Sequence, residues 1–198
     1  MLTVRGLARS GLRPFDLDLA AGECVAMMGP SGAGKTLVLR AIADLDPNEG
    51  RVGFDQVDRD AIPAPRWRRL VGYLPAEPGW WAEIVAEHFA DWAATVALVE
   101  ALGPPPRCGD WRVLRLSTGE RQRLALVHLL LLEPRVLPLD EPTSGLDPDA
   151  KSAVEGQIRQ RLTTGASALW VTHDGAQARR LARRCLVVDR GRIEERAA

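Results

Sequence analysis

A glycine-rich segment near the start of the chain carries residue types suited to phosphate chemistry. Residues 29–36 read Gly-Pro-Ser-Gly-Ala-Gly-Lys-Thr, which fits the phosphate-binding pattern G-x-x-x-x-G-K-[ST] at every fixed position. Glycines let successive backbone N–H groups curl around a polyphosphate, and a following helix points its positive end at it. Lys35 can reach the β and γ phosphates, and the Thr36 hydroxyl can ligate Mg²⁺. The residues expected to line this site are Gly29, Pro30, Ser31, Gly32, Ala33, Gly34, Lys35, Thr36 and Leu37.

Two neighbouring carboxylates end an apolar run further along the chain. Val136–Leu139 predicts a buried strand that stops at Asp140 and Glu141. The run resembles a Walker B segment, in which Asp140 holds Mg²⁺ through water and Glu141 polarises an attacking water as general base. A strand that simply meets solvent at two acids is the alternative, and the glycine-rich segment makes it the weaker one. Pro138 removes one donor from the strand, so we expect a local irregularity there.

A helix predicted over residues 121–132 begins with a segment that has two interpretations. Ser117 and Glu120 have the spacing of a capping box, which explains both residues without any ligand. A capped helix start with the bare backbone of Gly119 is also an anion site. The residues alone leave both interpretations open.

The elements that must hold these residues alternate between short strands and helices, which is typical of a layered α/β fold. Strands are predicted at 23–28, 136–139, 168–172 and 185–188, with a helix at 36–43. A further helix starts with Asp147 as cap and Pro148 at its first position, and ends before Gly165. Between residues 77 and 115 the strand signals vanish, and 82–102 predicts a helix. We therefore expect one domain over 1–198, with an α/β core at 1–76 and 116–198 and a short helical subdomain at 77–115.

Composition limits the possible classes of protein. The 198 residues carry 26 basic and 26 acidic side chains, so bulk charge gives no reason to expect a nucleic-acid partner. A hydrophobic content of 46% argues against disorder. Three dispersed cysteines argue against a disulfide scaffold or a cysteine-based zinc site. The longest apolar stretch, 124–132, is too short to span a bilayer and no secretory signal is visible, so we expect a soluble protein.

Several segments in a fixed order resemble the motifs of ATP-binding cassette (ABC) ATPases. Leu116-Ser-Thr-Gly-Glu120 resembles the signature motif, usually Leu-Ser-Gly-Gly-Gln. Ser144–Asp147 resembles the D-loop, and Trp170–Asp174 resembles the strand that ends at the switch histidine. The resemblance covers nearly the whole chain. It implies a P-loop NTPase (RecA-like) core with an inserted helical subdomain.

The resemblance also implies roles for these residues. In the family, two domains pack head to tail around two Mg-ATP, so each domain alone is half of each site. Lys35, Glu141 and His173 would then be catalytic, with His173 sensing the γ-phosphate, and Thr36 and Asp140 would hold Mg²⁺. The residues that would contact the ATP bound by the other copy are Ser117, Thr118, Gly119 and Glu120. Asp147 would lie at the dimer seam.

The chain departs from the family pattern in two places. No aromatic residue stands between Leu7 and Pro14 to stack on adenine, and Phe15 is too close to the following strand. Ala76 occupies the place of the Q-loop glutamine, which in the family touches Mg²⁺ and links to the permease. We therefore expect slow or partner-dependent hydrolysis.

The expected function is that of the ATP-binding and ATP-hydrolysing subunit of an ABC transporter. It would form a homodimer or pair with another ABC subunit, and act in the cytoplasm at the inner face of the membrane through separate permease subunits. Trp80 and Trp81 follow the Q-loop and either dock the permease or pack the helical subdomain. Compactness and the 168–174 stretch resemble small metal (iron) exporters or haem-exporter ATPases. A non-transport ABC ATPase and a regulatory module that dimerises on ATP with little hydrolysis are the alternatives.

Overall fold

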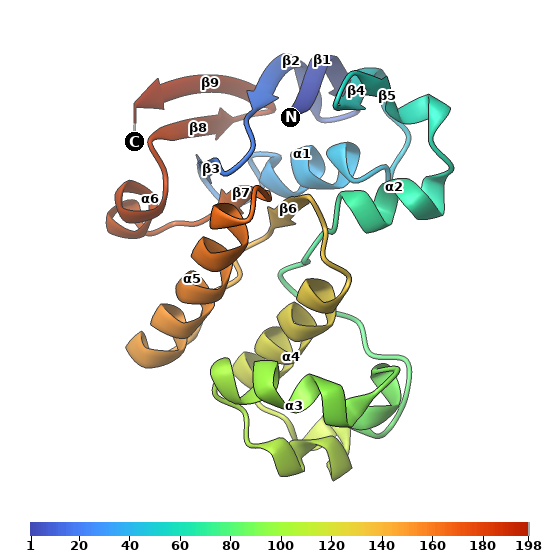
Figure 1. Cartoon of the computed structure of the whole chain (residues 1–198). Helices are drawn as coiled ribbons and strands as arrows, with labels where there is room; N and C mark the ends of the chain where they lie inside the picture. Colours follow the sequence, from blue (N-terminus) through green and yellow to red (C-terminus); the bar gives the residue numbers. More distant parts are fainter. Residues whose placement is uncertain (198) are drawn as a thin grey trace.

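The computed structural model describes residues 1–197, and their strands form two sheets (Figure 1). The larger sheet has the order β6-β7-β3-β8-β9. Its strands are β3 (Cys24–Met28), β6 (Val136–Leu139), β7 (Ser167–Val171), β8 (Arg184–Asp189) and β9 (Arg192–Ala197). Neighbouring pairs among β6, β7, β3 and β8 are parallel, and β9 pairs with β8 in an antiparallel hairpin. The parallel strands therefore end at one common edge, where the loops after β3, β6 and β7 meet.

The second sheet is antiparallel and has the order β2-β1-β4-β5. Its strands are β1 (Leu2–Arg9), β2 (Leu12–Leu19), β4 (Glu49–Phe54) and β5 (Val57–Asp58). Pro14 lies in β2, which is an edge strand, where a missing N–H is tolerated. Sequence reasoning missed these strands, although residues 15–19 of β2 alternate between buried apolar and exposed acidic residues, a signal that could have identified that strand.

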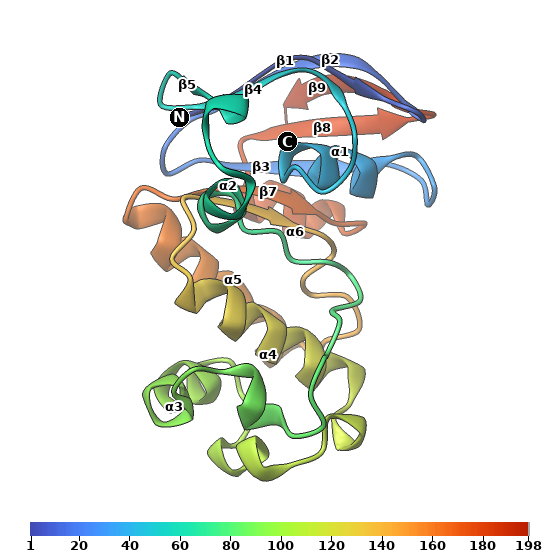
Figure 2. The same cartoon turned by 90° about the vertical axis from the view of Figure 1, so that its right-hand side faces the viewer.

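Helices cover both faces of the parallel sheet. α1 (Lys35–Ile42) buries Val38, Leu39 and Ile42 in a core shared with the antiparallel sheet. α4 (Thr118–Leu131) and α5 (Pro148–Thr163) pack on the opposite face, around Leu137, Leu139 and Trp170. Figures 1 and 2 show α1 beneath the antiparallel sheet and α4 and α5 below the parallel one. The remaining helices are η1 (Arg59–Ala61), α2 (Ala64–Leu70) and α6 (Gly175–Leu181). None of the helices within residues 1–197 is long and apolar enough to span a membrane.

The segment from 77 to 115 is made of short helices at the far end of α4 (Figure 1). They are η2 (Val85–His88), α3 (Trp92–Ala101), η3 (Pro106–Asp110) and η4 (Val113–Arg115). The prediction of one helix over 82–102 is wrong in its first half. Phe89 has an extended backbone and a buried ring against Trp92, and Asp91 is also extended and caps α3 through the backbone N–H of Ala94. This capping residue starts a new helix rather than continuing an old one.

The predicted irregularity at Pro138 is also present. Val71 and Leu74 form isolated parallel bridges with β6 at Val136 and Leu139. Pro138 accepts a hydrogen bond from Leu74 but has no N–H to return, so the ladder does not continue as a regular strand. The bridges nevertheless hold the segment 71–74 beside the end of β6.

Candidate nucleotide site

The glycine-rich loop connects the end of β3 to the start of α1. Gly29 has φ 146°, and a Cβ there would lie 2.0 Å from the carbonyl oxygen of Val188 in β8. Gly34 caps α1 with φ 110° and without a side-chain hydrogen bond. Both conformations are open mainly to glycine. The loop can thus lie close to β8 and present backbone N–H groups at the positive end of α1.

Lys35 folds back into this loop. It is 6% exposed, and its Nζ donates to the carbonyl oxygens of Gly29 at 2.8 Å and Pro30 at 2.9 Å. Burial lowers the pKa of Lys35, while the negative charges of Glu141 and Asp140 act in the opposite direction. The structure therefore holds an ammonium group at the centre of the loop, within reach of an anion that the loop encloses.

Three oxygen-bearing side chains meet beside this loop. Thr36 donates from Oγ1 to Asp140 Oδ2 at 2.6 Å, and Tyr73 donates from its hydroxyl to the same oxygen at 3.3 Å. Burial and the charge of Asp140 raise the pKa of Tyr73, so this phenol stays a donor. A hydroxyl and a carboxylate are the ligand types that Mg²⁺ prefers, so this pair fits the expected metal. Sequence reasoning missed Tyr73, because only the 71–74 bridges with β6 bring it here.

Glu141 and His173 form a second pair at the same edge of the sheet. His173 Nε2 lies 2.8 Å from Glu141 Oε1, because β6 and β7 are parallel neighbours that end side by side. Glu141 has φ 49°, a left-handed conformation that a residue with a side chain adopts at a cost. A hollow of about 200 Å³ opens beside the pair and is lined also by Thr143, Gly145 and Lys151. Its volume is ample for a water molecule next to the carboxylate.

The signature segment, residues 116–120, lies at the start of α4 and apart from the glycine-rich loop (Figure 1). Ser117 caps α4, accepting from the N–H of Glu120 at 3.2 Å while Glu120 Oε2 accepts from the N–H of Ser117 at 2.8 Å. Thr118 is the first residue of α4, and Gly119 packs so close to Leu146 that a Cβ would meet Cδ2 at 2.8 Å. α4 begins at the end of the molecule that carries α3 and runs toward the sheet (Figures 1 and 2).

Asp147 follows Leu146 directly and caps α5. Its Oδ1 accepts from the N–H of Ala150 at 2.9 Å, and this hydrogen bond lowers the pKa of Asp147. The structure thus gathers two groups of the predicted residues. Lys35, Thr36, Asp140, Glu141 and His173 lie around the glycine-rich loop. The signature residues lie at the start of α4, where Gly119 is close to Leu146, the neighbour of Asp147.

The two departures in the sequence have clear structural settings. Phe15 is buried in β2 opposite Leu7, so its ring is not exposed for stacking on a base. Ala76 is exposed in the segment that follows the β6 bridges. A glutamine from α4 reaches this segment instead: Gln122 Nε2 donates to the carbonyl oxygen of Pro75 at 3.1 Å.

Comparison with known proteins shows which family the chain belongs to. A sequence profile described as "ABC transporter" matches residues 12–144. The chain belongs to the ABC transporter family. It is 34% identical to a sulfate/thiosulfate import ATP-binding protein of Caulobacter vibrioides over 93% of this chain and 59% of that one. It is 37% identical to an aliphatic sulfonates import ATP-binding protein of Rhodopseudomonas palustris over 97% of this chain and 72% of that one. The chain spans about three fifths of the length of the first curated relatives it matches.

Solved structures match over the whole chain. An ATP-binding subunit of an ABC transporter has a TM-score of 0.88 at 25% identity, covering 100% of this chain and 90% of that one. An Atm1-family bacterial ABC exporter with ATP bound has a TM-score of 0.86 at 24% identity, covering 99% of this chain and 38% of that one. These matches confirm the predicted ABC ATPase fold with its P-loop core. The expected likeness to metal exporters is not borne out, because the curated relatives named above are import proteins.

Proposed function

We propose that this chain is the ATP-binding and ATP-hydrolysing subunit of an ABC transporter. One observation carries the proposal: three groups of residues meet at one edge of the sheet. They are the glycine-rich loop that contains Lys35 (hereafter the Lys35 loop), the Thr36–Asp140 pair at 2.6 Å and the Glu141–His173 pair at 2.8 Å. They provide, in one place, an anion cradle, oxygen ligands for a cation and a base next to a water-sized hollow. Nucleoside triphosphate hydrolysis needs these three provisions together.

The proposed reaction is attack of water on the γ-phosphorus of ATP. Glu141 accepts the proton of that water, the bond from phosphorus to the bridging oxygen breaks, and ADP and inorganic phosphate form. His173 holds Glu141 in place through Nε2 and faces the γ-phosphate. Lys35 leaves its two carbonyl partners to offset phosphate charge. Thr36 and Asp140 would hold Mg²⁺, which neutralises charge on the β and γ phosphates when bound.

The proposed active unit contains two such domains. The start of α4 lies apart from the Lys35 loop of its own chain, so Ser117 and Gly119 contact an ATP only if a second domain supplies it. Gly119 packs against Leu146, the neighbour of Asp147 in the chain, and this proximity supports a shared role for the signature segment and Asp147. We propose that the signature segment meets the Lys35 loop of another copy or of a paired ABC subunit, with Asp147 at the seam.

A groove beside the Ala76 segment is the proposed contact with a membrane permease. It has a volume of about 220 Å³, and its lining includes Trp80, Trp81 and His128. Trp80 packs on the core, whereas Trp81 is 71% exposed with its ring edge-to-face on His88 and His128. An exposed tryptophan beside an apolar hollow suits a binding anchor. The chain would then act in the cytoplasm at the inner face of the membrane, and the import relatives favour uptake as the direction.

We further propose that the segment 77–115 works as the helical subdomain and that Ala76 slows turnover. A methyl group can neither ligate a cation nor accept a hydrogen bond. Substitution Ala76→Gln should therefore raise the rate of phosphate release by purified protein. A parent enzyme that already hydrolyses ATP briskly, or a variant that is no faster, would contradict this part of the proposal.

Co-purification tests the transporter assignment. Tagged Glu141→Gln protein, expressed in its native cell and extracted from membranes in mild detergent with Mg-ATP, should retain a polytopic membrane protein in stoichiometric yield. The matched control is the same variant extracted without nucleotide. Recovery of a soluble partner, ribosomes or nucleic acid would refute the transporter assignment. Recovery of nothing but a dimer of the chain would favour the regulatory alternative.

A further inference from the structure

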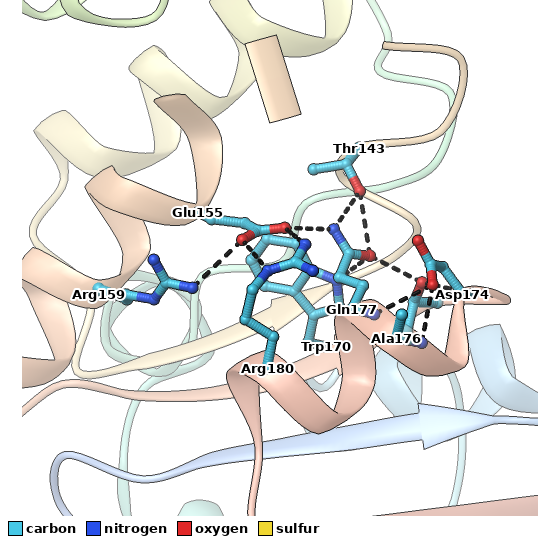
Figure 3. A network of polar contacts seen from close by, with 9 residues as sticks. Thr143, Glu155, Arg159, Trp170, Asp174, Ala176, Gln177 and Arg180 are labelled. Atoms are coloured by element: carbon cyan, nitrogen blue, oxygen red, sulfur yellow. Dashed lines mark hydrogen bonds and ion pairs between the residues drawn. The ribbon is translucent and has the colours of Figure 1, made fainter. Parts of the chain in front are cut away.

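A buried glutamine, Gln177, lies at the centre of a polar network that includes Thr143, Glu155 and Trp170 (Figure 3). Gln177 lies in α6 and is 2% exposed. Its Oε1 accepts from Thr172 Oγ1 at 2.8 Å and from the indole N–H of Trp170 at 3.3 Å. Its Nε2 donates to Thr143 Oγ1 at 2.9 Å and to Glu155 Oε1 at 2.9 Å. These four contacts match the two acceptor positions and two donors of an amide. Thr143 Oγ1 also lies 3.3 Å from Oε1, but its shorter contact is the one with Nε2.

The surroundings fix which way this amide points. The indole of Trp170 can only donate, so it requires the amide oxygen. The carboxylate of Glu155 can only accept, so it requires the amide nitrogen. A rotation that exchanges oxygen and nitrogen would lose both contacts and would set the amide oxygen against the Glu155 carboxylate. The direction of the two threonine bonds therefore follows from the positions of Trp170 and Glu155.

Glu155 is held as a carboxylate although it is only 3% exposed. Burial by itself would raise its pKa, but hydrogen bonds from Arg180 and Gln177 outweigh burial, and the pKa of Glu155 is lowered. Arg180 binds both oxygens, at 2.6 Å and 3.0 Å, and Arg159 adds a contact at 3.3 Å. A second carboxylate in place of the Gln177 amide would thus face a fixed negative charge and lack both donors.

The two threonines stand next to the proposed reacting groups in the chain. Thr143 is two residues after Glu141, and Thr172 immediately precedes His173. Thr172 also accepts from the backbone N–H of Asp174 through the same hydroxyl, at 3.0 Å. Each loop is therefore tied to the amide by a hydrogen bond within two residues of the side chain that it carries.

We propose that Gln177 is a positioning residue for hydrolysis, which ties the Glu141 loop to the His173 loop through one neutral, oriented amide. The inference rests on the proposed function and deepens it. A glutamine that only joined α6 to α5 would affect folding stability. A positioning residue affects the rate of the chemical step more than the binding of ATP, because the Lys35 loop belongs to other elements.

The test exchanges the amide of Gln177 and the carboxylate of Glu155, which interact in the parent protein. Gln177→Glu has the same shape but removes both donors, and should lower kcat on the order of tenfold or more, since misplacing reacting groups by 1 Å can cost about 100-fold. KM for ATP should stay within about twofold of the parent value, because a change that only misplaces the reacting groups lowers kcat without weakening the binding of ATP. The double variant with Glu155→Gln restores a donor opposite the new carboxylate and should recover most of the lost kcat. Gln160→Glu, the same change on the exposed face of α5, is the control and should match the parent.

A second pair of variants covers the case in which Gln177→Glu does not fold. Thr172→Val keeps the shape of the side chain but removes its hydroxyl, and Thr172→Ser keeps the hydroxyl. The serine variant should retain a clearly higher kcat than the valine variant at similar melting temperatures. Equal kcat in both, or Gln177→Glu turning over like the parent, would overturn the inference. Failure of the proposed function is a separate result: the parent would then turn over no faster than Glu141→Gln.

Discussion

Replacing Ser117 separates the two roles that the start of α4 can have. The hydroxyl of Ser117 accepts from the N–H of Glu120 at 3.2 Å, which makes it an ordinary helix cap. The proposed function also places it against the γ-phosphate of ATP bound by a second domain. Ser117→Ala removes both contacts, whereas Ser117→Asp keeps a good cap and adds a negative charge.

The structural part of the effect can be calculated. Loss of a serine cap costs about 1 kcal/mol. In a chain of 198 residues, such a loss lowers the melting temperature by about 2–4 °C. Ser117→Asp should return the melting temperature to the parent value or above, because a carboxylate is favourable at a helix N-terminus. Stability alone therefore ranks the aspartate variant above the alanine variant.

ATP-dependent dimerisation should rank the two variants in the opposite order. The assay is light scattering after size exclusion, in a Glu141→Gln background with Mg-ATP, at matched protein concentrations. Ser117→Asp should abolish the dimer because its carboxylate repels the γ-phosphate, and Ser117→Ala should weaken the dimer less. If Ser117→Asp dimerises as tightly as the Glu141→Gln parent, the start of α4 does not contact the partner's ATP, and the assignment of the signature segment is refuted.

Three further predictions follow from single contacts. Gly29→Ala should abolish nucleotide binding in a calorimetric titration, because its Cβ would lie 2.0 Å from the Val188 carbonyl oxygen; undiminished affinity would show that the loop tolerates a shift. Trp81→Ala should leave melting temperature and nucleotide affinity unchanged but release the co-purified permease, since the ring is 71% exposed; full retention would rule out this anchor. A hydrogen bond from Arg40 lowers the pKa of Asp46 to about 2, below its unfolded value of 3.8. The ionised Asp46 therefore adds to the free energy of unfolding above about pH 4, and this contribution is lost as the pH falls through about 2. In urea denaturation, the parent should have a higher free energy of unfolding than Asp46→Asn above that window, and the difference should vanish below it.

Local patterns in the sequence predict the parts of the site that are continuous in the chain. The loop before α1, the strand that ends at Asp140 and the capping box at Ser117 are each specified by residues within a few positions of one another. The fold around them follows because buried strands such as β3 and β6 are apolar along their whole length. The two pairs at the sheet edge then follow from parallel strands that end together.

Contacts between distant segments are what the sequence does not predict. Tyr73 contacts Asp140 because the isolated bridges of Val71 and Leu74 hold its segment beside β6. Pro138 interrupts this pairing, so the segment does not have the sequence pattern of a strand. Gln177 and Glu155 lie on separate helices, and nothing in either helical pattern marks them as partners. The helix predicted over 82–102 failed for a related reason, because a capping aspartate inside an alanine-rich run is a weak local signal until the neighbouring aromatic rings are buried.

Phosphate release tests the central claim most directly. Parent protein and Glu141→Gln should bind Mg-ATP with similar affinity, since Glu141 does not belong to the Lys35 loop. The parent should turn ATP over, slowly if Ala76 acts as proposed, and Glu141→Gln should be slower by about 100-fold or more, as expected for loss of a general base. Equal rates of phosphate release from the two proteins, with nucleotide bound to both, would contradict the assignment of Glu141 and with it the proposed hydrolytic site.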